Sequence, residues 1–251
     1  MRLAHFINIT LLAATLGTDA STLKKAGPYA AGAIDLWEKM WAGVKNAPNV
    51  LSSARLVEVT SPDGKKTVTA TYAERQDAVL LEIRVPTFEA TVNIGPGVQS
   101  AVEWSPDSKA FFVTTSDGGA NGWYHTLVFF VGSNSLTEID PTPVVLTSFG
   151  QPVKCDVPED PNVGAITWLH DSGDILIAAE IVNHSNCDSF GTFKAYEVSL
   201  PDLRIVKTYD QIEAKKLFRN SLGWEIRDAP DNCIRDPKSC WVTGNHGSPH
   251  R

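Results

Sequence analysis

The sequence predicts an all-β fold built from a repeated strand–turn–strand unit, and three observations support this prediction. Short runs rich in Val, Ile, Thr, Phe and Tyr alternate with turn residues, as expected for half-buried strands. The 18 glycines and 15 prolines of the 251-residue chain indicate many turns. Hydrophobic residues make up 43% of the chain, which is enough to bury a sizeable core and excludes a disordered or collagen-like protein.

Three turns share one plan that is built around an aspartate. They join RLVEVT to KKTVTATY through SPDG at 61–64, AVEW to KAFFVTTS through SPDS at 105–108, and AITW to DILIAAEI through LHDSG at 169–173. In the first two turns the proline presets φ at the second position, and Asp followed by Gly or Ser suits the next two. We therefore predict three β-hairpins.

Two further strands are expected after each hairpin. The third strands are predicted at 78–85, 126–131 and 192–200, and the fourth strands at 89–94, 136–146 and 204–209. Asp63 and Asp107 are 44 residues apart, whereas Asp107 and Asp171 are 64 apart. A proline-rich insertion at 140–164 accounts for the longer interval. The chain is thus expected to contain three four-stranded antiparallel units.

The second unit carries a family resemblance. The string VEWSPDSKAFFVTTSDGG, with LVFFV after it, resembles the WD40-like propeller repeats of the TolB type, whose signature is a strand ending in W-S-P-D-G-K. SPDGKKTVTATY is a weaker match because Thr60 replaces the tryptophan, and TWLHDSGDILIAAE keeps Trp168 but lacks Ser-Pro. The resemblance covers about residues 51–210. It implies a β-propeller-like array of four-stranded blades and carries no information on activity.

The sequence does not decide whether these blades form a closed ring. A closed propeller needs at least about four blades, and three are recognisable. A divergent fourth blade could be shared between the termini, with one strand at 240–242. Otherwise the blades form an open, capped array, or an oligomer closes the ring.

The chain is predicted to have four segments. Arg2, the apolar run 6–16 and the small residues at 18–20 indicate a signal peptide at 1–20, with an amphipathic N-terminal helix of a cytosolic protein as the alternative. Residues 21–49 form a helical segment, since apolar side chains recur there at helical spacing. The β-propeller-like domain is expected at 50–245 and a short tail at 246–251.

Four cysteines support export to an oxidising compartment, either secreted or periplasmic. They lie in polar, Pro/Asp/Asn-rich stretches, and none forms a CxxC motif, so we expect disulfides in place of buried free thiols. Proximity favours two pairs, Cys155–Cys187 and Cys233–Cys240. No segment after the signal reaches about 18 uninterrupted apolar residues, so we expect no membrane span.

A candidate binding face follows from blade topology. The loops between second and third strands share one face with the blade-to-blade connections and the insertion, which gives Cys155–Cys187 a geometric rationale. The candidate binding residues on this face are Asp117, Trp123, Tyr124, His125, His184 and Asp188. The alternative is that Trp123 and Tyr124 cap the core and that the histidines are solvated.

Other repeated residues have a structural interpretation. Trp104 and Trp168 occupy equivalent positions at the ends of first strands, so we expect them to pack between blades. Asp107 and Asp171 are expected to cap their turns through side-chain to backbone hydrogen bonds. His170 occupies the position of Pro106 and is expected to be a turn residue.

Catalytic motifs are missing from the sequence. It contains no GxSxG, HExxH, P-loop or GxGxxG motif. We expect no cofactor and assign no metal site, although His246 and His250 in the tail have the spacing of a ligand pair. The net charge of −7 argues against nucleic acid. We therefore expect an exported, non-enzymatic protein that binds a protein or a surface glycan. The alternatives are a carboxylate-dependent hydrolase and a structural module of an envelope assembly.

Overall fold

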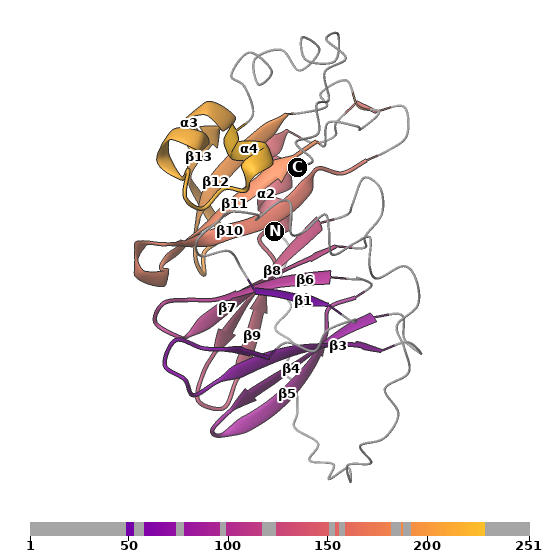
Figure 1. Cartoon of the computed structure of the whole chain (residues 1–251), viewed down its shortest axis with the longest axis vertical. Helices are drawn as coiled ribbons and strands as arrows, with labels where there is room; N and C mark the ends of the chain where they lie inside the picture. Colours follow the sequence, from indigo (N-terminus) through magenta and orange to yellow (C-terminus); the bar gives the residue numbers. More distant parts are fainter. Residues whose placement is uncertain are drawn as a thin grey trace, which may run out of the picture.

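Three antiparallel sheets follow one another along the chain (Figure 1). The computed structural model describes residues 49–52, 58–73, 78–95, 99–116, 124–150, 154–155, 159–181, 187 and 192–228. The first sheet contains β2 (Glu58–Thr60), β3 (Thr67–Ala73), β4 (Ala78–Val85) and β5 (Phe88–Asn93). The second contains β1 (Asn49–Ser52), β6 (Gln99–Trp104), β7 (Ala110–Ser116), β8 (Tyr124–Val131) and β9 (Leu136–Ile139). The third contains β10 (Asn162–Leu169), β11 (Asp174–Glu180), β12 (Phe193–Ser199) and β13 (Arg204–Asp210).

Each sheet has the order predicted for one repeat unit. The strands β2–β5, β6–β9 and β10–β13 pair with their neighbours in sequence, as consecutive hairpins do. The mostly β fold with three four-stranded antiparallel units is therefore confirmed. The second sheet gains a fifth strand, because β1 pairs antiparallel with β6 from Asn49↔Val102 to Ser52↔Gln99. The sequence analysis did not predict this strand.

Apolar side chains fill the spaces between successive layers. Phe111 of β7 faces the first sheet and belongs to a cluster with Leu81 and Ile83, whereas its neighbour Phe112 faces the third sheet and contacts Trp168. The second sheet is therefore buried on both faces, which explains why every residue of β7 is buried and why the strand begins with the apolar run AFFV. A third cluster lies between the third sheet and two C-terminal helices.

An equivalent hydrogen bond joins each sheet to the next. Trp104 Nε1 donates to the carbonyl of Val59 at 3.1 Å, and Trp168 Nε1 donates to the carbonyl of Glu103 at 3.2 Å. Trp104 is the last residue of β6 and Trp168 the last but one of β10, the first strands of the second and third units, and each acceptor lies in the first strand of the preceding unit. The prediction that Trp104 and Trp168 pack between units is confirmed.

The Asp-centred turns form a second repeated contact. Asp63 and Asp107 each accept the hydroxyl of the serine two residues before and the backbone N–H two residues after, as predicted for Asp107. The described third turn shows no such bond for Asp171, which stands at φ 52° in η1, so that prediction is wrong. Asp63 N–H donates to Ser108 Oγ at 3.0 Å, and Asp107 N–H donates to Ser172 Oγ at 3.4 Å. The hydrogen bonds between turns therefore join the same pairs of units as the tryptophan bonds, over the same sequence separations of 45 and 65 residues.

Threonine hydroxyls form hydrogen bonds with the backbone of β10 along the edge that does not pair with β11. Thr126 Oγ1 donates to the carbonyl of Val163 at 3.1 Å, and the Ala165 N–H donates to both Thr114 Oγ1 and Thr126 Oγ1. Thr142 Oγ1 in turn bonds to the backbone of Thr126. All these groups are buried, so the hydroxyls replace the strand that would otherwise satisfy this edge.

The predicted fourth strand of the second unit is shorter than expected. The prediction of a strand over 136–146 is wrong, because β9 ends at Ile139 and helix α2 (Thr142–Phe149) follows. Pro141 and Pro143 lack the N–H that a strand ladder needs but fit the first turn of a helix. Asp140 Oδ1 accepts the Thr142 N–H at 2.9 Å, and Gly150 ends the helix at φ 106°.

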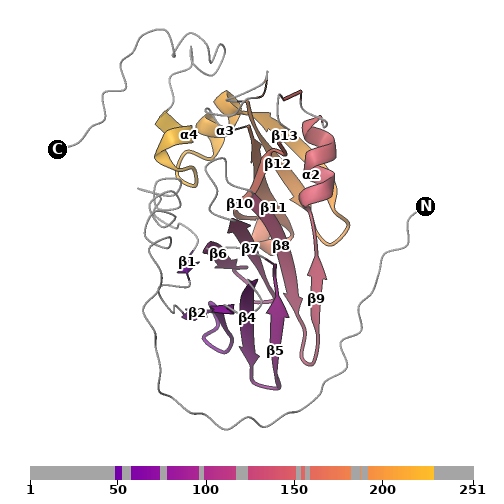
Figure 2. The ribbon, with the colours of Figure 1, turned by 90° about the vertical axis from the view of Figure 1, so that its right-hand side faces the viewer.

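Helices lie on both sides of the third sheet. Helix α2 contacts β8, β10, β11 and β13, and α3 (Gln211–Leu217) packs on β12 and β13 (Figure 2). Figure 2 shows α2 on one side of this sheet and α3 with α4 (Trp224–Asp228) on the other. A capping box begins α3: Asp210 Oδ1 accepts the Glu213 N–H, and Glu213 Oε2 accepts the Asp210 N–H. The D-x-x-E spacing was the sequence signal for this helix.

Several sequence predictions fall outside the described residues. They are the signal peptide, the helical segment up to residue 48, the strand at 240–242 and the pair Cys233–Cys240. Within the described ranges, no helix is long and apolar enough to cross a membrane.

Candidate functional site

A small pocket opens where β8 and β10 begin and β11 ends. Its floor lies on one face of β10 and β11, and its opposite wall is formed by the segment 221–226 before and within α4. Helices α3 and α4 cover this face of the third sheet (Figure 1). The pocket lies at the edge of the third hydrophobic cluster, which these helices form with the sheet.

Small residues create the pocket floor. Gly164 of β10 pairs directly with Ala178 of β11, so two adjacent positions on the floor carry little or no side chain. The larger Ile166 and Leu222 border this space. A Cβ at Gly164 would come no nearer than 3.7 Å to Thr114 Cγ2, which is ordinary contact. Gly164 therefore contributes its small size, because its backbone would accept other residues.

Polar groups stand at the rim of this apolar floor. Asn162 and Glu180 form the next cross-strand pair on the same face of the two strands, and Tyr124 at the start of β8 also lines the pocket. Ser221 completes the polar lining. An apolar floor with a few converging polar groups is the usual form of a ligand pocket. Among the described lining residues Glu180 is the single carboxylate, whereas glycoside hydrolysis normally uses two.

The structure separates two of the predicted binding residues. Tyr124 lines the pocket and is only 7% exposed, a position that fits both the predicted binding role and the core-capping alternative. His125 points to the other face of β8, where its Nε2 lies 3.3 Å from Asp140 Oδ1. The other four predicted binding residues, Asp117, Trp123, His184 and Asp188, lie outside the described residues.

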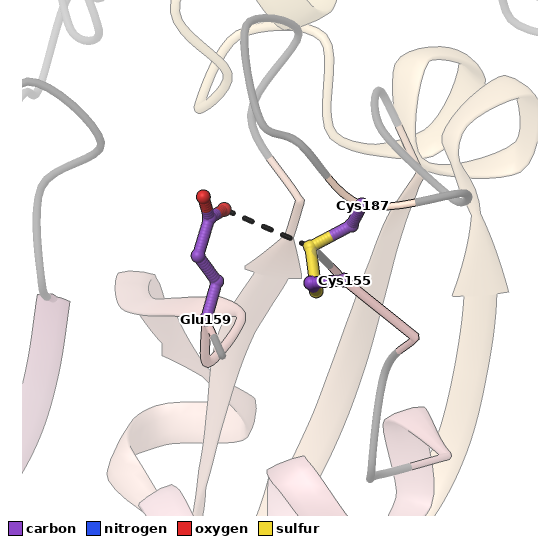
Figure 3. The surroundings of a disulfide bond; sticks show 3 residues. All are labelled: Cys155, Glu159 and Cys187. Atoms are coloured by element: carbon purple, nitrogen blue, oxygen red, sulfur yellow. Dashed lines mark hydrogen bonds between the residues drawn. A yellow bond between two sulfur atoms is a disulfide. The ribbon is translucent and has the colours of Figure 1, made fainter. Parts of the chain in front are cut away.

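A disulfide lies at the same end of the third sheet as the pocket. The predicted bond Cys155–Cys187 is present, and it joins the segment before β10 to the segment after β11 (Figure 3). Figure 3 also shows the side chain of Glu159 directed at it, with Oε2 3.7 Å from Cys187 Sγ. A disulfide sulfur carries no proton to donate, so this is a close approach of a carboxylate to an apolar group. The bond ties the insertion to the loop between β11 and β12.

A second cluster of polar side chains lies at the opposite end of the third sheet. His170, Asp174 and Glu197 each offer one ligand atom, and these atoms all lie within 4.8 Å of one another. His170 is a turn residue in η1 (His170–Ser172), as predicted, but it also approaches Glu197, with Nε2 3.2 Å from Oε1. Sequence reasoning missed the cluster because its members come from a turn and two strands without motif spacing.

A carboxyl group is buried at the junction of the second and third sheets. Burial raises the pKa of Glu103 in β6 to about 7, although the hydroxyl of Thr167 donates to its Oε1 at 3.3 Å and lowers the pKa in part. In the described part of the chain its Oε2 has no hydrogen-bond partner. This group titrates near neutral pH.

Comparisons with known proteins do not extend the structural description. No protein-family model matches the chain, and no curated protein matches it.

Proposed function

We propose that this chain is an exported β-propeller-like binding protein that recognises a protein or a surface glycan at its loop face. We define the loop face as the end of the second and third sheets that carries the pocket and the disulfide Cys155–Cys187. The pocket is the observation that carries the proposal. Its apolar floor and polar rim suit contact with one side chain or one face of a sugar ring, and this lining suits binding better than hydrolysis.

The TolB-type resemblance and the contacts between sheets support the propeller-like arrangement. Trp104 and Trp168 repeat one hydrogen bond at each junction, as blades of a regular array would. The cover that α3 and α4 place over the third sheet favours the open, capped array among the three ways of closing it, because terminal repeats need a capped outer face.

The disulfide supports export. Cys187 is buried, and its bond to Cys155 would persist in an oxidising compartment but not in a reducing cytosol. The described helices include none that could span a membrane. Removal of the predicted signal at 1–20 would release the domain into that compartment.

Filling the pocket tests the proposed function. Ala178→Leu adds three carbons to the floor, so we expect capture of the partner from the native envelope fraction, or binding to a surface-glycan array, to fall at least tenfold. Gly164→Ala should cause a smaller loss. The control is Ala90→Leu on β5 of the first sheet, far from the pocket in sequence and sheet. Melting temperatures of all three variants would be measured, because overpacking costs about 1–3 kcal/mol.

The two readouts separate the outcomes. Binding lost in Ala178→Leu with the melting temperature retained supports the pocket as the recognition site. Binding that is retained by a folded Ala178→Leu protein contradicts it.

A further inference from the structure

The third sheet carries a donor set at the end remote from the pocket. The register pairs Asp174 with Ser199 and Leu176 with Glu197, so Asp174 and Glu197 are diagonal neighbours on one face. His170 approaches them from the turn between β10 and β11. We propose that His170, Asp174 and Glu197, the His170 cluster, bind a divalent transition-metal ion of the Zn²⁺ class.

Glu197 is held in place by a partner of its own. Its side chain is 10% exposed, and Tyr209 donates its hydroxyl to Oε2 at 2.8 Å. This bond directs the other oxygen, Oε1, towards His170, which lies 3.2 Å away. A ligand that is itself fixed by a hydrogen-bond partner is the usual construction of a protein metal site. Tyr209 is thus a positioning residue for the cluster.

The two carboxylates of the cluster have no Lys or Arg side chain paired with them in the described part of the chain. Two carboxylates lie within 4.8 Å of each other, and in the described ranges no Lys or Arg nitrogen forms an ion pair with Asp174 or Glu197. The nearby Lys207 places Nζ over the ring of Tyr209, 4.6 Å from its centre. A divalent ion bound between the two carboxylates would offset the charge of both.

The exposure of the three side chains would let an ion enter from solvent and let the ligands close around it. The His170 side chain is 68% exposed and sits in a tight turn, so an ion can reach the cluster from solvent. Ligand atoms on one Zn²⁺ stand about 2 Å from the metal, so they lie nearer to one another than 4.8 Å. His170 and Asp174 would therefore move inward by side-chain rotation, while the buried Glu197 stays fixed.

The donor types select the class of ion. One imidazole and two carboxylates with open positions suit Zn²⁺ and its neighbours in the first transition row. Ca²⁺ prefers six to eight oxygen ligands and would gain nothing from the imidazole. The cluster is independent of the pocket, since it uses other residues at the other end of the sheet.

Calorimetric titration of the metal-free full chain with Zn²⁺ tests the proposal. We expect the wild-type chain to bind one Zn²⁺ at this cluster, and its affinity to fall at least tenfold in Asp174→Asn and in His170→Asn. Asparagine is chosen at position 170 because it tolerates the positive φ there. Tyr209→Phe should lose about tenfold, because it removes only the hydroxyl that orients Glu197. The control His246→Gln/His250→Gln, which removes the histidine pair of the tail, should leave this affinity unchanged.

Three results would overturn the proposal. One is an unchanged Zn²⁺ affinity in folded Asp174→Asn and His170→Asn proteins. Another is loss of all Zn²⁺ binding in the tail control. The third is Ca²⁺ displacing Zn²⁺ at equal concentration, which would show a site of oxygen ligands alone. Circular dichroism of each variant confirms that it is folded.

Discussion

At the scale of single residues, polar groups at the junctions between sheets decide how this protein responds to its surroundings. Glu103 lies between the second and third sheets, where Thr167 of the third sheet is its hydrogen-bond donor. Burial raises its pKa from 4.5 to about 7, so the folded protein binds this proton more tightly than the unfolded chain does. The ionised form is therefore a cost to the folded state.

The stability of the protein should fall as pH rises from about 4.5 to 7, over the interval between the unfolded and folded pKa values of Glu103. Glu103→Gln removes this dependence. We expect the variant to be about 2–3 kcal/mol more stable than the wild type at pH 8, with the difference vanishing below pH 4.5. Urea unfolding at several pH values measures it. The exposed Glu89→Gln is the control, and an equal gain there would contradict the assignment.

At the scale of elements, strand ends and turns join one sheet to the next. The junctions repeat because equivalent residues in successive units meet equivalent partners, as Trp104 with Val59 and Trp168 with Glu103 show. The first unit has Thr60 in place of tryptophan. It therefore accepts this hydrogen bond from the second unit but has no indole N–H to donate an equivalent one. The repeat thus has a direction along the chain.

The two tryptophans should have matching energetic roles. Trp104→Phe and Trp168→Phe each remove the indole N–H and leave a backbone carbonyl without this donor, in a buried bond at Val59 and a partly buried one at Glu103. We expect each to lower the free energy of unfolding by about 1–3 kcal/mol, with similar values for the two. Chemical denaturation measures both. A large loss in one variant and none in the other would contradict equivalent junctions.

At the scale of the whole molecule, the disulfide connects the insertion to the third sheet. Cys155 and Cys187 are 32 residues apart, and the bond restricts the unfolded chain over that loop. Cys155 also packs against the cluster that includes Phe149 and Tyr196, so the bond holds α2 and the third sheet as one body.

Breaking this disulfide should destabilise the molecule as a unit. We expect Cys155→Ser/Cys187→Ser to lower the free energy of unfolding by about 2–4 kcal/mol. Peptide mapping of the exported protein without reductant should recover the peptide that links these cysteines, and the Cys233–Cys240 peptide predicted from sequence. Free thiols at 155 and 187 in that protein would contradict both the bond and the compartment.

The sequence by itself determined the repeat, its strands and turns, and one disulfide, because these depend on local chemistry. Alternating apolar residues specify strands, Asp with Pro and Gly specifies turns, and short strand connections permit few pairings. It missed β1 because the four residues Asn49–Ser52 become a strand only beside β6. The strand predicted after Asp140 is a helix, α2, because the two prolines in this apolar run favour the start of a helix.

Tertiary structure alone decided where chemistry can occur. The pocket needs the Gly164–Ala178 pair beneath a wall from 221–226, and the His170 cluster needs the register of β11 on β12. Tyr124 and His125 are adjacent in sequence, yet strand geometry sends one into the pocket and the other to Asp140. These contacts cannot be predicted from residue types and spacing, because they arise from packing between segments that lie far apart in the chain.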